Sequence, residues 1–226
     1  MVFDALAFMR ENARVFRKYL FLPIFFAILS LFLGKIPGFG LALSVIANAV
    51  AVAVALVGVS ATRFYLLKNA DAVAEGANRP FARFFFLAFM VNALTQMLGV
   101  LFLLPPSMYI VILMVVLIGL WLGLKTSLAF PALAMDHPGS LLDNLKESFI
   151  WTNGNNIKII VAFMVCYSPV LFFFMMILQV SSFAPEAENL WGTMPQLIFH
   201  HILTIFCMMW LSLVLAKIYQ EVAARR

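Results

Sequence analysis

The stretch IKIIVAFMVCYSPVLFFFMMILQV, residues 157–180, contains a single charged residue, Lys158, close to its start. A helix needs about 20 apolar residues to cross the roughly 30 Å of hydrocarbon in a bilayer. The stretch therefore predicts a transmembrane helix. Five further segments have the same character, and they fall at residues 19–33, 39–67, 81–104, 108–133 and 197–218.

The composition of the chain agrees with six membrane-spanning helices. Hydrophobic residues make up 65% of the 226 residues, and the mean hydropathy is +1.04. Soluble domains average only about 45–50% apolar residues. The six segments use most of the chain, so we expect an all-α polytopic membrane protein with one membrane domain, residues 1–226.

Positively charged residues are distributed unequally between the two sides of this predicted bundle. Fourteen of the 15 Lys and Arg residues lie before the first segment, at the end of the sixth or beyond it, or at the second and fourth joints, including the helix ends that flank these joints. The remaining joints contain only Lys35. Cations that flank membrane helices stay on the cytoplasmic side. We therefore expect a bacterial inner-membrane protein with both termini in the cytoplasm and the loop Ser181–Pro195 outside.

The fourth joint, from Pro138 to Asn156, predicts a short amphipathic helix on the cytoplasmic surface. Ser140 and Asp143 match a capping box, in which each side chain bonds a free backbone N–H of the other residue. Apolar residues then recur at helical spacing, as in helices that lie in the membrane interface: Leu141, Leu142, Leu145 and Phe149. Residues 2–18 resemble this pattern. Three residues are expected at the lipid surface, where cations attract anionic headgroups: Lys146, Trp151 and Lys158.

The chain also admits a division into three repeats, each a surface helix followed by a helical hairpin. The repeats would cover residues 1–67, 68–136 and 137–226. The stretch from Met9 to Arg17 is matched by the stretch from Ile150 to Lys158. Such repeats would be parallel, unlike the inverted repeats of many transporters. Chance similarity between apolar segments explains the match equally well.

Two neighbouring motifs in the second half of the chain form a pattern. Phe130-Pro131-Ala132-Leu133-Ala134 is followed, after a polar joint, by Leu145-Lys146-Glu147-Ser148-Phe149-Ile150-Trp151-Thr152-Asn153-Gly154-Asn155. This pattern resembles that of the bacterial YciC-like proteins and of the membrane domains attached to some glycerophosphodiester phosphodiesterases. The chain departs from it where Phe149 and Ile150 separate Ser148 from Trp151, and where Asn153 replaces a basic residue. The resemblance implies six helices and an envelope role, without an active site.

Polar residues within the predicted spans form a candidate binding face. Asn92, Thr95 and Gln96 fall on one helical face of the third segment. Asn48 begins a stripe of small and polar residues on the second segment, at a similar predicted depth. Two interpretations remain. In the first, the face packs helices together, since amides hydrogen-bond between membrane helices. In the second, it lines a cavity for a solute or a lipid headgroup.

Two other features of the fourth segment concern helix packing. Gly119 and Gly123 form a GxxxG motif, which is typical of close helix contacts. Lys125 follows it, and its side chain either snorkels to the headgroups or forms a buried ion pair. The spanning segments contain no acidic residue that could serve as its partner.

Several kinds of chemistry are not expected. The motifs of zinc proteases, serine hydrolases and P-loop enzymes are absent from the sequence. We predict no metal site and no cofactor, because His200 and His201 point to different helical faces and Cys166 and Cys207 lie mid-segment. The pI of 9.4 does not indicate nucleic-acid binding, because the cations lie at helix ends.

These observations favour a non-enzymatic component of the bacterial envelope, acting as a scaffold, assembly factor or regulator. The alternative is a small permease or lipid-handling protein that uses the face of Asn48, Asn92 and Gln96. The expected partners are membrane lipids, including anionic headgroups, and a protein partner or a second copy of the chain in the membrane.

Overall fold

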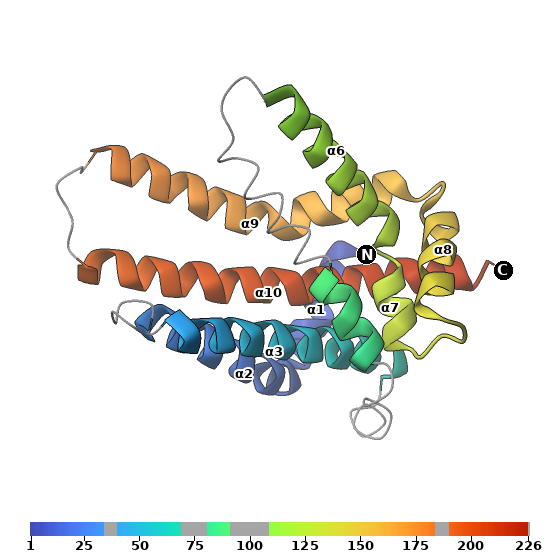
Figure 1. Cartoon of the computed structure of the whole chain (residues 1–226). Helices are drawn as coiled ribbons and strands as arrows, with labels where there is room; N and C mark the ends of the chain where they lie inside the picture. Colours follow the sequence, from blue (N-terminus) through green and yellow to red (C-terminus); the bar gives the residue numbers. More distant parts are fainter. Residues whose placement is uncertain (34–39, 69–80, 91–108, 184–189, 226) are drawn as a thin grey trace.

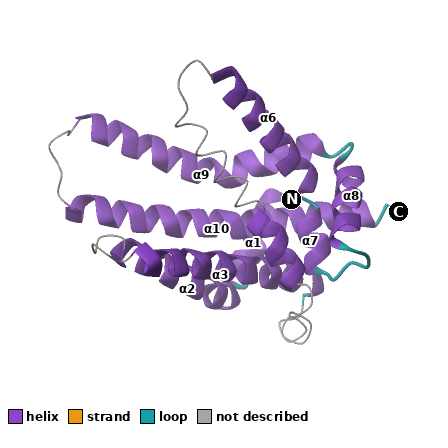
Figure 2. Cartoon of the chain, in the orientation of Figure 1, coloured by secondary structure: helices purple, strands orange, loops and turns teal. Residues whose placement is uncertain are grey.

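A computed structural model describes residues 1–33, 40–68, 81–90, 109–183 and 190–225. All elements in these ranges are helices, so the predicted all-α class is confirmed (Figure 2). The labelled helices are α1 (Val2–Glu11), α2 (Ala13–Leu33), α3 (Gly40–Leu67), α6 (Tyr109–Thr126), α7 (Ala129–Ala134), α8 (Leu141–Thr152), α9 (Asn156–Phe183) and α10 (Leu190–Ala223). Residues Phe81–Met90 are helical as well.

Helix α10 forms the centre of the bundle. It packs against α9 on one side and against α3 and α2 on the other (Figure 1). Leu213, Val214, Ala216 and Ile218 are fully or almost fully buried along it. The short helices α7 and α8 lie at the end of the bundle where the chain terminates (Figure 1).

Among the described residues, three helices are long and apolar enough to cross a membrane: Ala13–Leu33, Asn156–Met176 and Pro195–Ala223. Few residues of the first two helices are buried, whereas most residues of the third are. The other three predicted segments overlap α3, the helix Phe81–Met90 and α6, which are apolar in their described parts.

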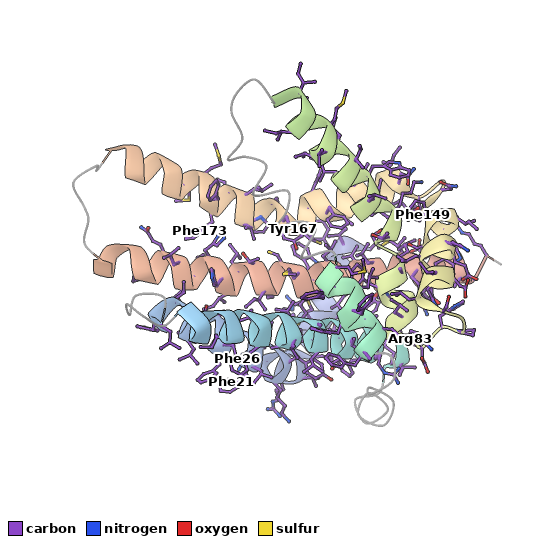
Figure 3. The ribbon with its side chains drawn as sticks, in the orientation of Figure 1. Phe21, Phe26, Arg83, Phe149, Tyr167 and Phe173 are labelled. Carbon is purple, nitrogen blue, oxygen red and sulfur yellow. The ribbon has the colours of Figure 1, made fainter. Side chains whose placement is uncertain are left out.

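Large apolar side chains cover the outer surface of the bundle (Figure 3). Phe21 of α2, Ile110 of α6 and Phe172 of α9 are 70%, 72% and 69% exposed. Soluble proteins rarely expose contiguous apolar patches of this kind. The surface is the one expected of helices that face lipid.

The fourth predicted segment, 108–133, is not one continuous helix. Helix α6 ends at Thr126, and α7 begins at Ala129. Pro131 has no backbone N–H, and its ring clashes with the carbonyl four residues earlier, which is that of Ser127. The Ser127 hydroxyl and backbone N–H both bond to the Leu124 carbonyl oxygen, at 2.7 and 3.4 Å. The helix therefore turns at residues 127–128.

The predicted external loop Ser181–Pro195 is also shorter than expected. Helix α9 continues to Phe183, and α10 begins at Leu190. Pro195 lies inside α10. A proline can be tolerated within a membrane helix because neighbouring groups satisfy the freed carbonyl.

Close helix packing occurs at Gly58 of α3, whereas Gly123 of the predicted GxxxG motif has no close neighbour among the described residues. A Cβ atom added to Gly58 would lie 2.9 Å from Cζ of Phe84, whereas one added to Gly123 would meet no atom within 4 Å. Phe84 is buried and has an edge-to-face contact with Phe130, with ring centroids 5.2 Å apart. The small residue is therefore needed at Gly58.

Replacing Gly58 with leucine should lower the free energy of unfolding by about 1–3 kcal/mol, as overpacking does in well-filled cores. Gly123→Leu is the matched control, and it should change stability far less. Both are measured by SDS-induced unfolding in mixed micelles. Equal losses in the two variants would contradict this assignment of the helix contact.

Candidate functional site

The structure describes only part of the predicted polar face. Asn48 lies within α3, but its side chain, and residues Asn92, Thr95 and Gln96, lie outside the described residues. The stripe that begins at Asn48 continues along α3 through Ala55, Gly58 and Thr62, which are all buried. In this half of α3 the stripe packs against other helices.

The three residues expected at the lipid surface have different environments. Lys146 is exposed on α8. Lys158 is exposed as well, and its Nζ lies 3.4 Å from a carboxylate oxygen of Glu221 on α10. Trp151 is only 4% exposed. Its ring makes edge-to-face contacts with His137 and Tyr219, with centroids 5.4 and 5.3 Å apart. The placement of Trp151 at the lipid surface is therefore wrong.

Trp151 is buried because α8 turns its polar face toward the protein. The buried residues of α8 are Asn144, Ser148, Trp151 and Thr152, which share one side of a helix. Leu142 and Ile150 project outward instead. The predicted capping box is present: Ser140 Oγ accepts from the Asp143 N–H at 3.2 Å, and the Asp143 carboxylate accepts from the Ser140 N–H at 2.9 Å. The Ser140 hydroxyl also donates to the Asp143 carboxylate at 2.6 Å, and this bond, together with the one from the Ser140 N–H, lowers the pKa of Asp143.

The most distinctive polar feature is a buried lysine held between three helices. Lys125 near the end of α6 is 7% exposed. Its Nζ donates to Oδ1 of Asn153 at 2.7 Å and to Oδ1 of Asn156 at 3.4 Å. The Ser148 hydroxyl of α8 donates to the Lys125 carbonyl oxygen at 2.7 Å. We call Lys125, Ser148, Asn153 and Asn156 the lysine clamp.

The lysine clamp differs from both interpretations of Lys125. Its side chain is buried within the protein rather than extended along the surface, and among the described residues its partners are amide oxygens and not a carboxylate. Arg63 of α3 is also buried, and its Nη1 donates to the Ala134 carbonyl oxygen of α7 at 3.0 Å. Lys125 thus connects α6 to the α8–α9 turn, and Arg63 connects α3 to α7. Sequence inspection missed Asn153 and Asn156, although a lysine in an apolar segment signals that acceptors must lie nearby.

This arrangement connects α6 to α8 and to the α8–α9 turn through hydrogen bonds. Neutral amide and carbonyl oxygens cannot take a proton from an ammonium group at neutral pH. Among the described residues, no three His, Cys, Asp or Glu side chains are placed to hold a metal ion. His200, which lies beside Phe173 at a centroid distance of 6.4 Å, belongs to no such group.

A second set of polar contacts attaches α1 to α10. The Trp210 indole N–H donates to the Val2 carbonyl oxygen at 3.0 Å, and Lys217 Nζ donates to an Asp4 carboxylate oxygen at 2.6 Å. The bond from Lys217 is the main cause that lowers the pKa of Asp4 to about 2. Phe8 on α1 also packs edge-to-face on Tyr65 of α3, with ring centroids 5.0 Å apart.

Comparisons of the chain with models of known protein families, with curated proteins and with solved structures find no match. The resemblance to the YciC-like group therefore stays a prediction. The class that the described fold defines is that of a helical protein with several helices suited to a membrane.

Proposed function

We propose that this chain is a non-enzymatic, six-helix protein of the bacterial inner membrane, with both termini in the cytoplasm. It acts as a scaffold, assembly factor or regulator through contacts between helices and with lipids. The chain's cationic joints would then all face the cytoplasm, together with α7 and α8. The resemblance to YciC-like proteins agrees with this assignment.

The observation that carries the proposal is the way the interior around α10 is filled. Apolar and small side chains occupy it, while aromatic and aliphatic side chains cover the outside of α2, α6 and α9. The buried cation Lys125 lies where α6 meets the α8–α9 turn, and the buried cation Arg63 lies where α3 meets α7. Each donates a hydrogen bond to a neutral oxygen. A packed interior supports a structural role better than a solute pathway through the described helices.

The alternative, a permease or lipid-handling protein, depends on Asn48, Asn92, Thr95 and Gln96 lining a cavity. Cysteines introduced separately at Asn92 and Gln96 decide between the two functions. In a background that lacks Cys166 and Cys207, we expect both to resist a water-soluble thiol reagent, because packed amide faces exclude water. Lys146→Cys on the exposed side of α8 is the positive control for labelling.

Rapid labelling at residues 92 and 96, at a rate close to that of the cysteine at residue 146, would contradict the scaffold proposal. It would favour the permease. Replacing Asn92 or Gln96 with leucine gives an independent test, in which the free energy of unfolding is measured. Packing residues should lower stability when changed, by about 0.6–2 kcal/mol for an amide that bonds between helices, whereas cavity-lining residues should not.

A further inference from the structure

A groove of about 590 Å³ lies beside the turn that joins α1 to α2. One wall is a face of α1 and includes Phe3, Leu6 and Arg10. The other is a face of α2 and includes Phe16, Arg17 and Leu20. In each wall these residues recur at the three- and four-residue spacing of one helical face. Side chains of α10 complete the lining.

The walls of the groove are held in place. Trp210 and Lys217 of α10 bond to Val2 and Asp4 of α1, as described above. The turn at Asn12 is closed by a bond from its amide nitrogen to the Phe8 carbonyl oxygen, at 3.0 Å. The groove is therefore preformed, and its volume lies within the range of roughly 300–1,000 Å³ that is usual for small-molecule sites.

The positive charge of the groove lies at the end next to the α1–α2 turn. Arg10 and Arg17 are exposed, one on each wall, and both lie close to the turn at Asn12. Acidic residues are absent from the lining, and no described carboxylate forms an ion pair with either arginine. The lining away from the two guanidinium groups is apolar. The groove thus matches a molecule with an anionic head and a hydrocarbon chain.

We propose that this groove is a binding site for an anionic phospholipid of the inner leaflet, with the phosphate between Arg10 and Arg17 and an acyl chain along the apolar walls. The assignment rests on the proposed function, which places these arginines at the cytoplasmic membrane surface. Basic pockets between membrane helices on that side bind lipid headgroups. Arginine is suited to phosphate because its planar fork donates two parallel hydrogen bonds.

Hydrocarbon walls favour a lipid over a free anion. An inorganic phosphate would use only the two guanidinium groups, whereas most of the lining is apolar. The lipid is already in the bilayer, so its chain enters the groove from a neighbouring apolar phase. Selectivity for anionic over zwitterionic lipid must then come from Arg10 and Arg17, and this defines the test.

The test uses the purified full chain in maltoside micelles, titrated with dioleoylphosphatidylglycerol or dioleoylphosphatidylcholine, with bound lipid counted by native mass spectrometry. We expect phosphatidylglycerol to bind more tightly than phosphatidylcholine. Arg10→Gln/Arg17→Gln should weaken phosphatidylglycerol binding roughly thirtyfold, as expected for the loss of two surface cations that each attract anionic lipid. Arg14→Gln/Lys18→Gln is the matched control, because it removes the same charge from α2 outside the groove.

A second variant tests the apolar walls without changing charge. Ala7→Trp places a large ring in the groove, since Ala7 lines it on the α1 side. This variant should also lose phosphatidylglycerol binding, and the circular dichroism spectrum checks that it remains folded. Inorganic phosphate at millimolar concentration should not displace the lipid from the wild-type protein.

Three results would overturn the inference: equal binding of the two lipids, equal losses in the two charge variants, or displacement of the lipid by inorganic phosphate. Dimerisation or capture of an acidic peptide that depends on Arg10 and Arg17, without lipid selectivity, would also overturn it. Alkaline extraction of cell membranes distinguishes failure of the lipid-site inference from failure of the proposed membrane function. If the wild-type chain stays in the membrane pellet, the membrane assignment stands even where the lipid site fails.

Discussion

Replacing Asn153 with leucine should lower the free energy of unfolding by about 1.5–3 kcal/mol, the range measured for hydrogen bonds to charged groups. The reason is the burial of Lys125, whose Nζ lies 2.7 Å from the Asn153 amide oxygen and 3.4 Å from that of Asn156. Without Asn153, the ammonium group keeps the longer bond to Asn156 as its remaining partner among the described residues. The change is measured by SDS titration of the purified protein in mixed micelles.

The Lys125→Met background provides the decisive control for this prediction. When the charge is absent, no buried ammonium group is left without its acceptor, and Asn153→Leu should then cost little. Lys146→Met, a change of the same type at an exposed residue of α8, should stay within about 0.5 kcal/mol of wild type. If Asn153→Leu destabilised the wild type and the Lys125→Met variant equally, the lysine clamp would not be the source of the effect.

Truncation of Leu213 should have a comparable or larger effect. Leu213 lies in the C-terminal half of α10 and is fully buried. Leu213→Ala would leave a cavity among α10 and its neighbours, and such losses cost about 2–5 kcal/mol in well-packed cores. Lipid tails can relax around a shortened side chain, whereas packed helices cannot. Leu171→Ala on the exposed face of α9 is therefore expected to be nearly neutral in the same unfolding assay.

The pair of leucines separates a protein core from a lipid-facing surface. A loss at Leu171 as large as that at Leu213 would mean that α9 is covered by another protein surface, such as a second copy of the chain. Concentration-dependent unfolding of the wild type would support that outcome. Small losses in both variants would contradict the central position of α10.

Much of the fold follows from local sequence patterns. Long apolar runs predicted the helices α2, α9 and α10, and the Ser140/Asp143 pair predicted the start of α8. These features are set by the nearest neighbours in the chain, namely apolar run length and capping chemistry. The break after Thr126 was missed because the predicted helix was extended through Pro131 on apolarity alone.

The burial of individual side chains was harder to predict. Hydropathy distinguishes membrane from water, but it does not distinguish lipid from protein, because lipid tails are as apolar as leucine. Trp151 was therefore placed at the lipid surface, although it packs on Tyr219. For the same reason, the acceptors of Lys125 emerge only when α6 and the α8–α9 turn are brought together. The face of Asn48, Asn92, Thr95 and Gln96 stays a prediction.

The measurement that tests the membrane assignment most directly is thiol labelling in oriented vesicles. Single cysteines are placed at Lys146, Gly192 and Arg225 in a Cys166→Ala/Cys207→Ala background, and a membrane-impermeant reagent is added to inside-out or right-side-out vesicles. We predict that residues 146 and 225 react only in inside-out vesicles and that residue 192 reacts only in right-side-out vesicles. Reaction of residues 192 and 225 from the same side would contradict the crossing of the membrane by α10, and with it the proposed topology.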